Sequence, residues 1–200
     1  MTRLISTILL TFLISGCSIL PWSGDDDSEI LIFLSADQFN TWDLTAKFSV
    51  TSPEGTESGS VRWILGAEEE RLDILSPTGA AVARLTVTGD QARLKTDDNE
   101  YTAPDAESLF KEALDLQFPV SAMRSWIRGL ESPDLPLHSI KKDSEGRITT
   151  LVQNGWTVEY SGSLSIASGH YRYEVPRRLS ASKDEFEIRW ANTEWQIPVQ

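Results

Sequence analysis

A strict alternation of apolar and polar residues from Trp42 to Thr51 constrains the fold of this chain more than any other feature. Apolar side chains stand at every second position, and Asp, Thr, Lys or Ser residues stand between them. This period of two is that of a strand with one buried face. Shorter apolar runs separated by turn residues predict further strands, at 61–65, 72–74, 82–87, 92–95, 148–153, 156–161, 171–175, 178–182 and 186–190.

The middle of the chain has helical spacing instead. Residues 104–114 begin with proline and acidic residues, which favour the start of a helix. Residues 119–127 carry apolar residues at helical spacing, and Gly129 suits the end of that helix. A short helix is also predicted over 29–40. The order of strands, helices and strands predicts a mainly β fold in which helices lie across one face of a curved antiparallel sheet.

The N-terminus resembles an export signal that ends at a lipid-attachment cysteine. One arginine precedes an apolar run over residues 4–14, which is shorter than the roughly 20 residues of a membrane span, and Ser15-Gly16 stand directly before Cys17. The alternative is an ordinary signal peptide with a chance cysteine. Because Cys17 is the only cysteine, no internal disulfide can form. We expect a signal peptide over 1–16, acyl groups on Cys17, a flexible tether over 17–29 and one domain over 30–200.

Charge and motifs exclude several classes of function. The net charge is −12, and removal of the signal with its single arginine makes it −13, which argues against binding of nucleic acid. His138 and His170 lie far apart in the sequence and have no partner cysteine, so they do not form a metal motif. The acidic runs at 25–27 and 68–70 are typical of solvated surface. We expect no catalytic residues, no metal and no cofactor, and therefore not an enzyme.

Several sequence blocks together resemble the LolB family of outer-membrane lipoprotein receptors. They lie in order along nearly the whole mature chain, and the blocks at 101–107 and 118–130 are the most specific. The blocks are ISGC (14–17), WDLTAKF (42–48), RLDILSPTG (71–79), YTAPDAE (101–107), FPV (118–120), SWIRGL (125–130), NGW (154–156) and PRRL (176–179).

This resemblance implies a LolA/LolB-like incomplete antiparallel β-barrel, a half-barrel closed by a helical lid over an apolar cavity. Such proteins accept lipoproteins from the periplasmic carrier LolA and place them in the outer membrane, so LolA, the acyl chains of lipoprotein cargo and outer-membrane lipid are the expected partners of a monomer. Ser18 is not the aspartate of an inner-membrane retention signal, which implies the periplasmic face of the outer membrane. The competing hypotheses are a lipid-anchored protein that binds a small hydrophobic ligand without a carrier, and an enzyme or envelope scaffold.

Large apolar side chains on the strand faces and helices are the candidates for the cavity wall. From the pattern alone a packed core explains them better than a cavity does, whereas the resemblance favours the cavity. The candidates are Phe48, Trp63, Leu72, Ile74, Leu85, Phe110, Met123 and Trp126.

The turn Pro77-Thr78-Gly79 is the candidate for the membrane-facing loop. LolB-like proteins carry a bulky apolar residue, typically leucine, in this exposed turn, and Thr78 stands at that position here. The resemblance therefore supports the transfer role more strongly than the step of membrane insertion. Ala80, Ala81 and Val82 are the apolar residues that could take over this contact.

Overall fold

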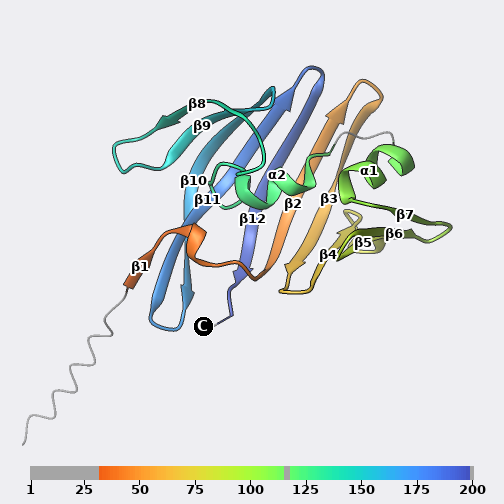
Figure 1. The fold of residues 1–200 in the computed structure, drawn as a ribbon, viewed down its shortest axis with the longest axis horizontal. Helices are drawn as coiled ribbons and strands as arrows, with labels where there is room; N and C mark the ends of the chain where they lie inside the picture. The colour runs from red at the N-terminus through yellow and green to blue at the C-terminus, as the bar shows by residue number, and fades with distance from the viewer. Residues whose placement is uncertain (1–31, 115–117, 199–200) are drawn as a thin grey trace, which may run out of the picture.

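The computed structural model describes residues 32–114 and 118–198, which form a twelve-stranded sheet and three helical segments (Figure 1). The strands are β1 (Ile32–Leu34), β2 (Trp42–Ser52), β3 (Gly55–Leu65), β4 (Glu69–Leu75), β5 (Ala81–Thr88), β6 (Gln91–Thr96), β7 (Glu100–Ala103), β8 (Leu137–Lys142), β9 (Ile148–Gln153), β10 (Trp156–Ser168), β11 (Tyr171–Lys183) and β12 (Phe186–Gln196). The helical segments are the 3₁₀ turn η1 (Ala36–Gln38) and the helices α1 (Ala106–Leu114) and α2 (Val120–Trp126).

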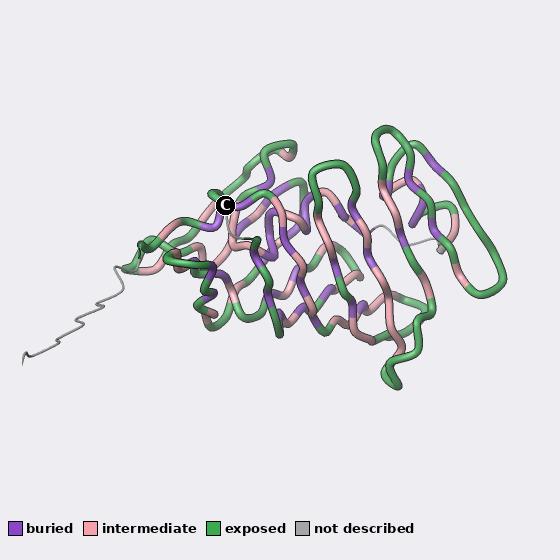
Figure 2. Tube along the Cα trace, turned by 90° about the horizontal axis from the view of Figure 1, so that it is seen from below, coloured by how far each residue is buried: buried purple, intermediate pink, exposed green. Residues whose placement is uncertain are grey.

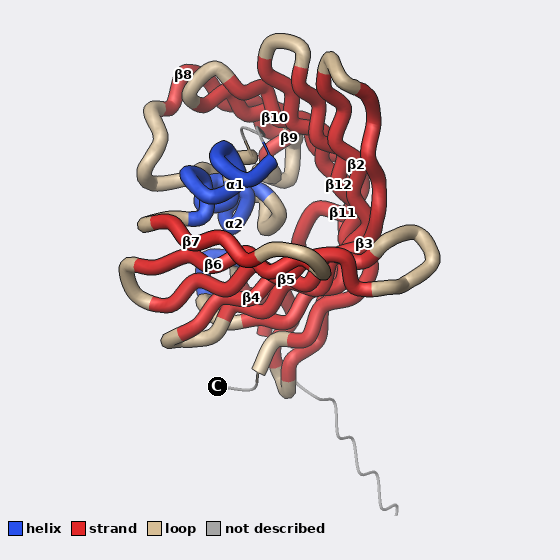
Figure 3. Tube along the Cα trace, turned by 90° about the vertical axis from the view of Figure 1, so that its right-hand side faces the viewer, coloured by secondary structure: helices blue, strands red, loops and turns tan. Residues whose placement is uncertain are grey.

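The sheet is antiparallel apart from β1, and it is not closed into a barrel. Its strands lie in the order β7-β6-β5-β4-β3-β2-β12-β11-β10-β9-β8, so that β7 and β8 are the two edges, and β1 pairs in parallel with the start of β11. Figure 3 shows both α-helices inside the curve of the sheet, with α1 beside β6 and β7. The expected half-barrel with a helical lid is therefore confirmed.

The alternation in β2 sorts its side chains between two faces, as predicted. Trp42, Leu44 and Ala46 are buried on the concave face, whereas Asp43, Thr45 and Lys47 face outward. The burial of a large apolar side chain contributes about 1.5–3 kcal/mol. Figure 2 shows the consequence for the whole domain, with exposed residues gathered at the turns and buried residues along the strands.

A buried polar group fastens α2 to the sheet. The Glu70 carboxylate of β4 is only 4% exposed. Its Oε1 accepts hydrogen bonds from Trp63 Nε1 at 2.8 Å and from Arg124 Nε at 2.7 Å, and its Oε2 accepts one from Arg124 Nη2. A buried carboxylate is tolerated only when it is paired in this way. Glu70 therefore connects β3, β4 and the lid helix.

The end of α2 is held by Gly129 and Arg128. Gly129 adopts a left-handed φ of 77°, as its expected place after the helix requires. A Cβ there would lie 2.9 Å from Cγ of Pro176, so only glycine fits between the helix and β11. Arg128 donates to the backbone oxygen of Phe39 at 2.8 Å, and burial lowers the pKa of its guanidinium.

The helix predicted over 29–40 is not formed in the described part of this segment. Residues 32–34 form β1, in which the amide of Ile32 donates to the carbonyl oxygen of His170 at 2.9 Å, and 36–38 form η1. The first residues of β11 are not paired with β12, which leaves them available to β1. Strand pairing there satisfies the backbone of 32–34 better than a short helix would, because short helices are marginal without packing.

Other predicted elements change in extent. The strands predicted at 171–175 and 178–182 are one strand, β11, which continues through Pro176 opposite Ser163. The edge strands β7 and β8 were not predicted. The remaining predicted strands and both predicted helices are present, but β3, β10 and β12 each extend six or seven residues beyond the predicted range.

The two ends of the sheet carry different turns and chain termini. The strand directions place the turns after β2, β4, β9 and β11 at one end, whereas β1 and the last residues of β12 lie at the other (Figure 1). The expected signal peptide, Cys17 and tether lie outside the described residues. None of the described helices has the length and apolar content that crossing a membrane requires.

Candidate functional site

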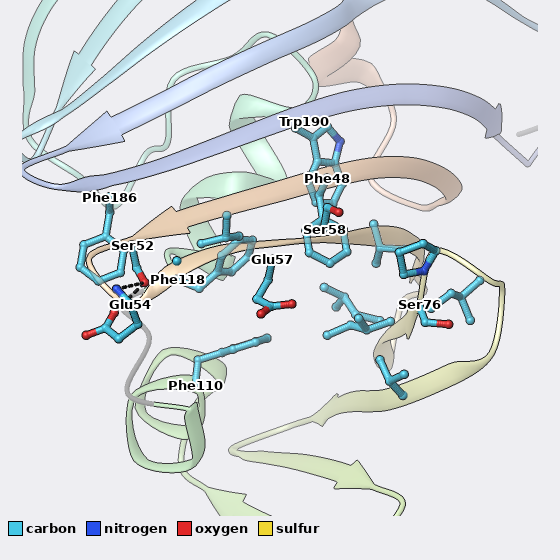
Figure 4. Close-up of a pocket in the computed structure, with 18 residues that line it drawn as sticks. Phe48, Ser52, Glu54, Glu57, Ser58, Ser76, Phe110, Phe118, Phe186 and Trp190 are labelled. Carbon is cyan, nitrogen blue, oxygen red and sulfur yellow. Dashed lines mark hydrogen bonds between the residues drawn. The ribbon is translucent and has the colours of Figure 1, made fainter.

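An apolar cavity of about 590 Å³ lies at the end of the half-barrel away from β1 (Figure 4). Cavities of roughly 300–1,000 Å³ are typical of small-molecule sites. Its wall is formed by strands β2 to β5, the start of β12, helix α1 and Phe118. The lining residues are Phe48, Val50, Ser52, Glu54, Gly55, Glu57, Ser58, Val61, Leu72, Ile74, Leu75, Ser76, Pro77, Val82, Phe110, Phe118, Phe186 and Trp190.

Half of the eight candidate residues line this cavity. Phe48, Leu72 and Ile74 come from β2 and β4, and Phe110 reaches across from α1. Phe48 and Ile74 are only partly buried, as expected for side chains that border an open space.

The other four candidates lie elsewhere in the structure. Trp63, Leu85, Met123 and Trp126 are each 0% exposed and belong to the packed core. Trp63 is turned into an aromatic cluster, with its ring centroid 6.4 Å from that of Trp42, and Trp126 lies against Trp156. The faces of their strands and helix are the expected ones, but neighbouring side chains fill the space in front of them, so these residues do not line the cavity.

Several lining residues were not among the candidates. Val50 and Val61 share the face of Phe48 and could have been found from the period of two. Phe186 and Trp190 lie on β12, which pairs with β2 although the two strands are far apart in the sequence. Phe118 lies in the connection between the helices, where periodicity gives no signal.

The shape of the cavity near Phe48 depends on a glycine. Gly59 lies opposite Phe48 across the β2–β3 pair. A Cβ at Gly59 would clash with the backbone oxygen of Leu75 and lie 3.3 Å from the Phe48 ring. The missing side chain therefore lets β4 approach β3 closely and leaves the Phe48 ring its place in the cavity wall.

The turn after β4 forms one side of the cavity mouth. Pro77, Thr78 and Gly79 are exposed, and Pro77 also lines the cavity. Gly79 has a left-handed φ of 86°, and its amide donates to the Ser76 oxygen at 2.8 Å. The hydroxyl oxygens of Ser76 and Thr78 lie 2.8 Å apart, in hydrogen-bonding contact. The turn is thus compact, and its tip is more polar than a leucine would make it.

The opposite side of the mouth is the turn between β2 and β3. The Ser52 hydroxyl donates to Glu54 Oε2 at 2.6 Å, and this hydrogen bond holds the pKa of the Glu54 carboxyl below its usual value. Figure 4 shows this turn and Ser76 at opposite sides of the cavity.

A second large cavity has a different character. It measures about 560 Å³ and lies between η1, the end of α2 and strands β8 to β11. Its wall carries five charged residues, namely Arg128, Lys142, Asp143, Arg147 and Glu174. An acyl chain would leave these groups without water, so the apolar cavity is the better site for it.

The described residues contain no group of three His, Cys, Asp or Glu side chains that could hold a metal ion. The cavity wall likewise presents no histidine or cysteine. Its chemistry is that of apolar surface with a few hydroxyls and two carboxylates.

Comparison with known proteins places these features in a family. The model of the family described as outer membrane lipoprotein LolB matches residues 40–195. The outer-membrane lipoprotein LolB of Alkalilimnicola ehrlichii is 32% identical over 201 residues, which cover 98% of this chain and 97% of that protein. The protein of the same name from Cupriavidus pinatubonensis is 36% identical over 175 residues, which cover 86% of this chain and 82% of that one.

Among solved structures, a LolA superfamily protein from Nitrosomonas europaea is similar with a TM-score of 0.48 and 10% identity, over 84% of this chain and 89% of that one. The family assignment depends on the sequence matches, which extend over most of the chain and over most of the named relatives. This chain therefore belongs to the LolB family.

Proposed function

We propose that this protein is an outer-membrane lipoprotein receptor, anchored through Cys17 on the periplasmic face, which accepts lipoproteins from LolA and places them in the membrane. The observation that carries the proposal is the apolar cavity, which is open at the end where the exposed turn after β4 lies. The relatives named outer-membrane lipoprotein LolB support the location. The proposed role needs neither a cofactor nor catalysis.

The energetics of lipid transfer explain why a cavity is needed. An acyl chain of about 16 carbons gains roughly 12 kcal/mol on leaving water, at about 0.8 kcal/mol for each buried CH₂. Free diffusion of a lipoprotein through water is therefore too costly. If the cavity binds the acyl chains more tightly than the carrier does and more weakly than a bilayer does, each transfer step lowers the free energy. Differential affinity alone then drives the cargo from carrier to receptor to membrane.

The position of the cavity makes a long tether useful. Strand β2 has eleven residues and spans roughly 36 Å at about 3.3 Å per residue, so the cavity mouth lies far from the end where β1 begins. A tether over residues 17–29 reaches at most roughly 45 Å when extended. This length suffices for the domain to turn its mouth toward the membrane that holds Cys17.

The direct test mixes purified LolA, loaded with a lipoprotein, with this protein and follows whether the cargo changes hands. Transfer to this protein and onward to liposomes supports the proposal. Binding of hydrophobic dyes without any uptake from LolA would instead indicate a receptor for a small hydrophobic ligand. Turnover of any substrate would contradict the absence of catalysis.

The anchor can be tested separately. Cys17→Ala is expected to abolish labelling by radioactive fatty acid and lipoprotein-type cleavage, because the thiol that carries the lipid is lost. Fractionation and labelling of cells that express either form provide the measurement. Labelled fatty acid on the Ala variant would refute the assignment of Cys17.

The turn after β4 gives a further prediction. Thr78→Leu adds an exposed apolar tip beside Pro77, and burial of a leucine side chain contributes about 1.5–3 kcal/mol. We expect about tenfold tighter liposome binding of a form that begins at residue 30, without the signal or Cys17, with unchanged uptake from LolA. Thr78→Glu is expected to slow delivery to liposomes while uptake persists. Delivery at the parent rate by Thr78→Glu would show that this turn has no role in insertion.

A further inference from the structure

The charges that border the apolar cavity are all of one sign. Among the described residues that line it, only Glu54 and Glu57 are ionisable, and both are acidic. Several carboxylates elsewhere on the sheet are paired with cations, as in the ion pairs of Asp43 with Arg62 and of Asp73 with Arg84. The cavity wall has no such compensation.

Glu57 is the carboxylate that reaches into the cavity. It lies on β3 opposite Val50 of β2, and Figure 4 shows it extending from β3 toward Phe110 of α1. No described residue forms an ion pair or a hydrogen bond with its side chain. Glu57 is exposed at the cavity wall, so solvent partly screens its charge, and it acts on a bound molecule with the moderate strength of a charge near a protein surface.

We infer that Glu57 sets a charge preference for the molecules that enter the cavity. Chains whose polar end is neutral or cationic are accepted, and chains with an anionic end, such as anionic phospholipids, are disfavoured. The inference rests on the proposed function in that it takes acyl chains as the occupants. Apolar walls cannot distinguish the acyl chains of cargo from those of membrane lipid. The negative charge of Glu57 can, because it repels a lipid whose headgroup is also negative.

The test is a competition between two lysolipids with the same hexadecanoyl chain. Equimolar lysophosphatidylcholine, whose headgroup has no net charge, and anionic lysophosphatidylglycerol are added to the full lipidated chain, and native mass spectrometry gives the ratio of the two complexes. The parent protein is expected to prefer the choline lipid by roughly fourfold, the factor for two charges about 10 Å apart at an effective dielectric constant of about 40.

Glu57→Gln is expected to remove this preference, and Glu57→Lys to reverse it. Glu69→Gln is the matched control, because Glu69 is an exposed acid on the adjacent strand that does not line the cavity; it should keep the parent ratio. Equal ratios for the parent protein and Glu57→Gln, with both lipids bound, would overturn the role of Glu57 and leave the proposed function standing. Absence of any bound lysolipid would overturn the cavity as an acyl site, and this inference with it.

Discussion

Replacement of Arg124 by methionine is expected to destabilise the domain by about 3 kcal/mol, because it leaves a buried carboxylate without its cation. Glu70 is 4% exposed and would keep only the hydrogen bond from Trp63 Nε1. Methionine preserves much of the apolar stem of Arg124, so the loss of the ion pair dominates. For a domain of this size, the change corresponds to a decrease in Tm of roughly 6–12 °C, which thermal unfolding followed by circular dichroism measures.

Two further variants make the interpretation specific. Combining Arg124→Met with Glu70→Gln is expected to recover more than half of the loss, since a neutral amide costs less to bury and its oxygen still accepts from Trp63. Arg62→Met is the matched control, because the pair of Arg62 and Asp43 is exposed and surface pairs contribute little. An unchanged Tm for Arg124→Met would show that Glu70 does not need this partner, and that α2 is held by packing alone.

The sequence predicted the sheet and the helices because their signals are local. The alternation in β2 and the apolar spacing of α2 depend only on neighbouring residues, and burial of one face then determines which side chains turn inward. The segment over 32–38 was assigned to the wrong element because its structure is set by β11, whose residues lie far along the chain. Long-range pairing of this kind overrides weak local preference.

The cavity was harder to predict than the fold. A concave strand face looks the same in sequence whether the space in front of it is filled or open. Trp63 and Ile74 both face inward, from β3 and β4, yet Trp63 packs against Trp42 and Trp190, whereas Ile74 borders the cavity. Which positions stay open depends on how α1 and Phe118 cover the sheet, and this is a property of the assembled structure.

The largest functional effect is expected from Ile74→Asp. Ile74 lies on β4, half-buried at the cavity wall, where an aspartate side chain can remain hydrated within the open space. We expect cargo uptake from LolA to decrease more than tenfold, because the acyl chain would have to displace that water. The domain should remain folded, with a loss of stability of about 1–2 kcal/mol from the shortened side chain.

Leu85→Asp is the counterpart that separates a cavity from a core. Leu85 lies on β5, the next strand, opposite Leu72, and it is fully buried. A charge there has no access to water and costs several kcal/mol, so unfolding is expected to come first and loss of uptake to follow from it. Measurements of unfolding and of cargo uptake on both variants and on Ile74→Val distinguish a cavity wall from a packed core. If Ile74→Asp loses stability and uptake in parallel as Leu85→Asp does, the residues around Ile74 are ordinary core. In that case the acyl chains of the cargo would have to bind elsewhere, because a residue whose replacement by aspartate unfolds the domain is packed in the core and does not line an open cavity.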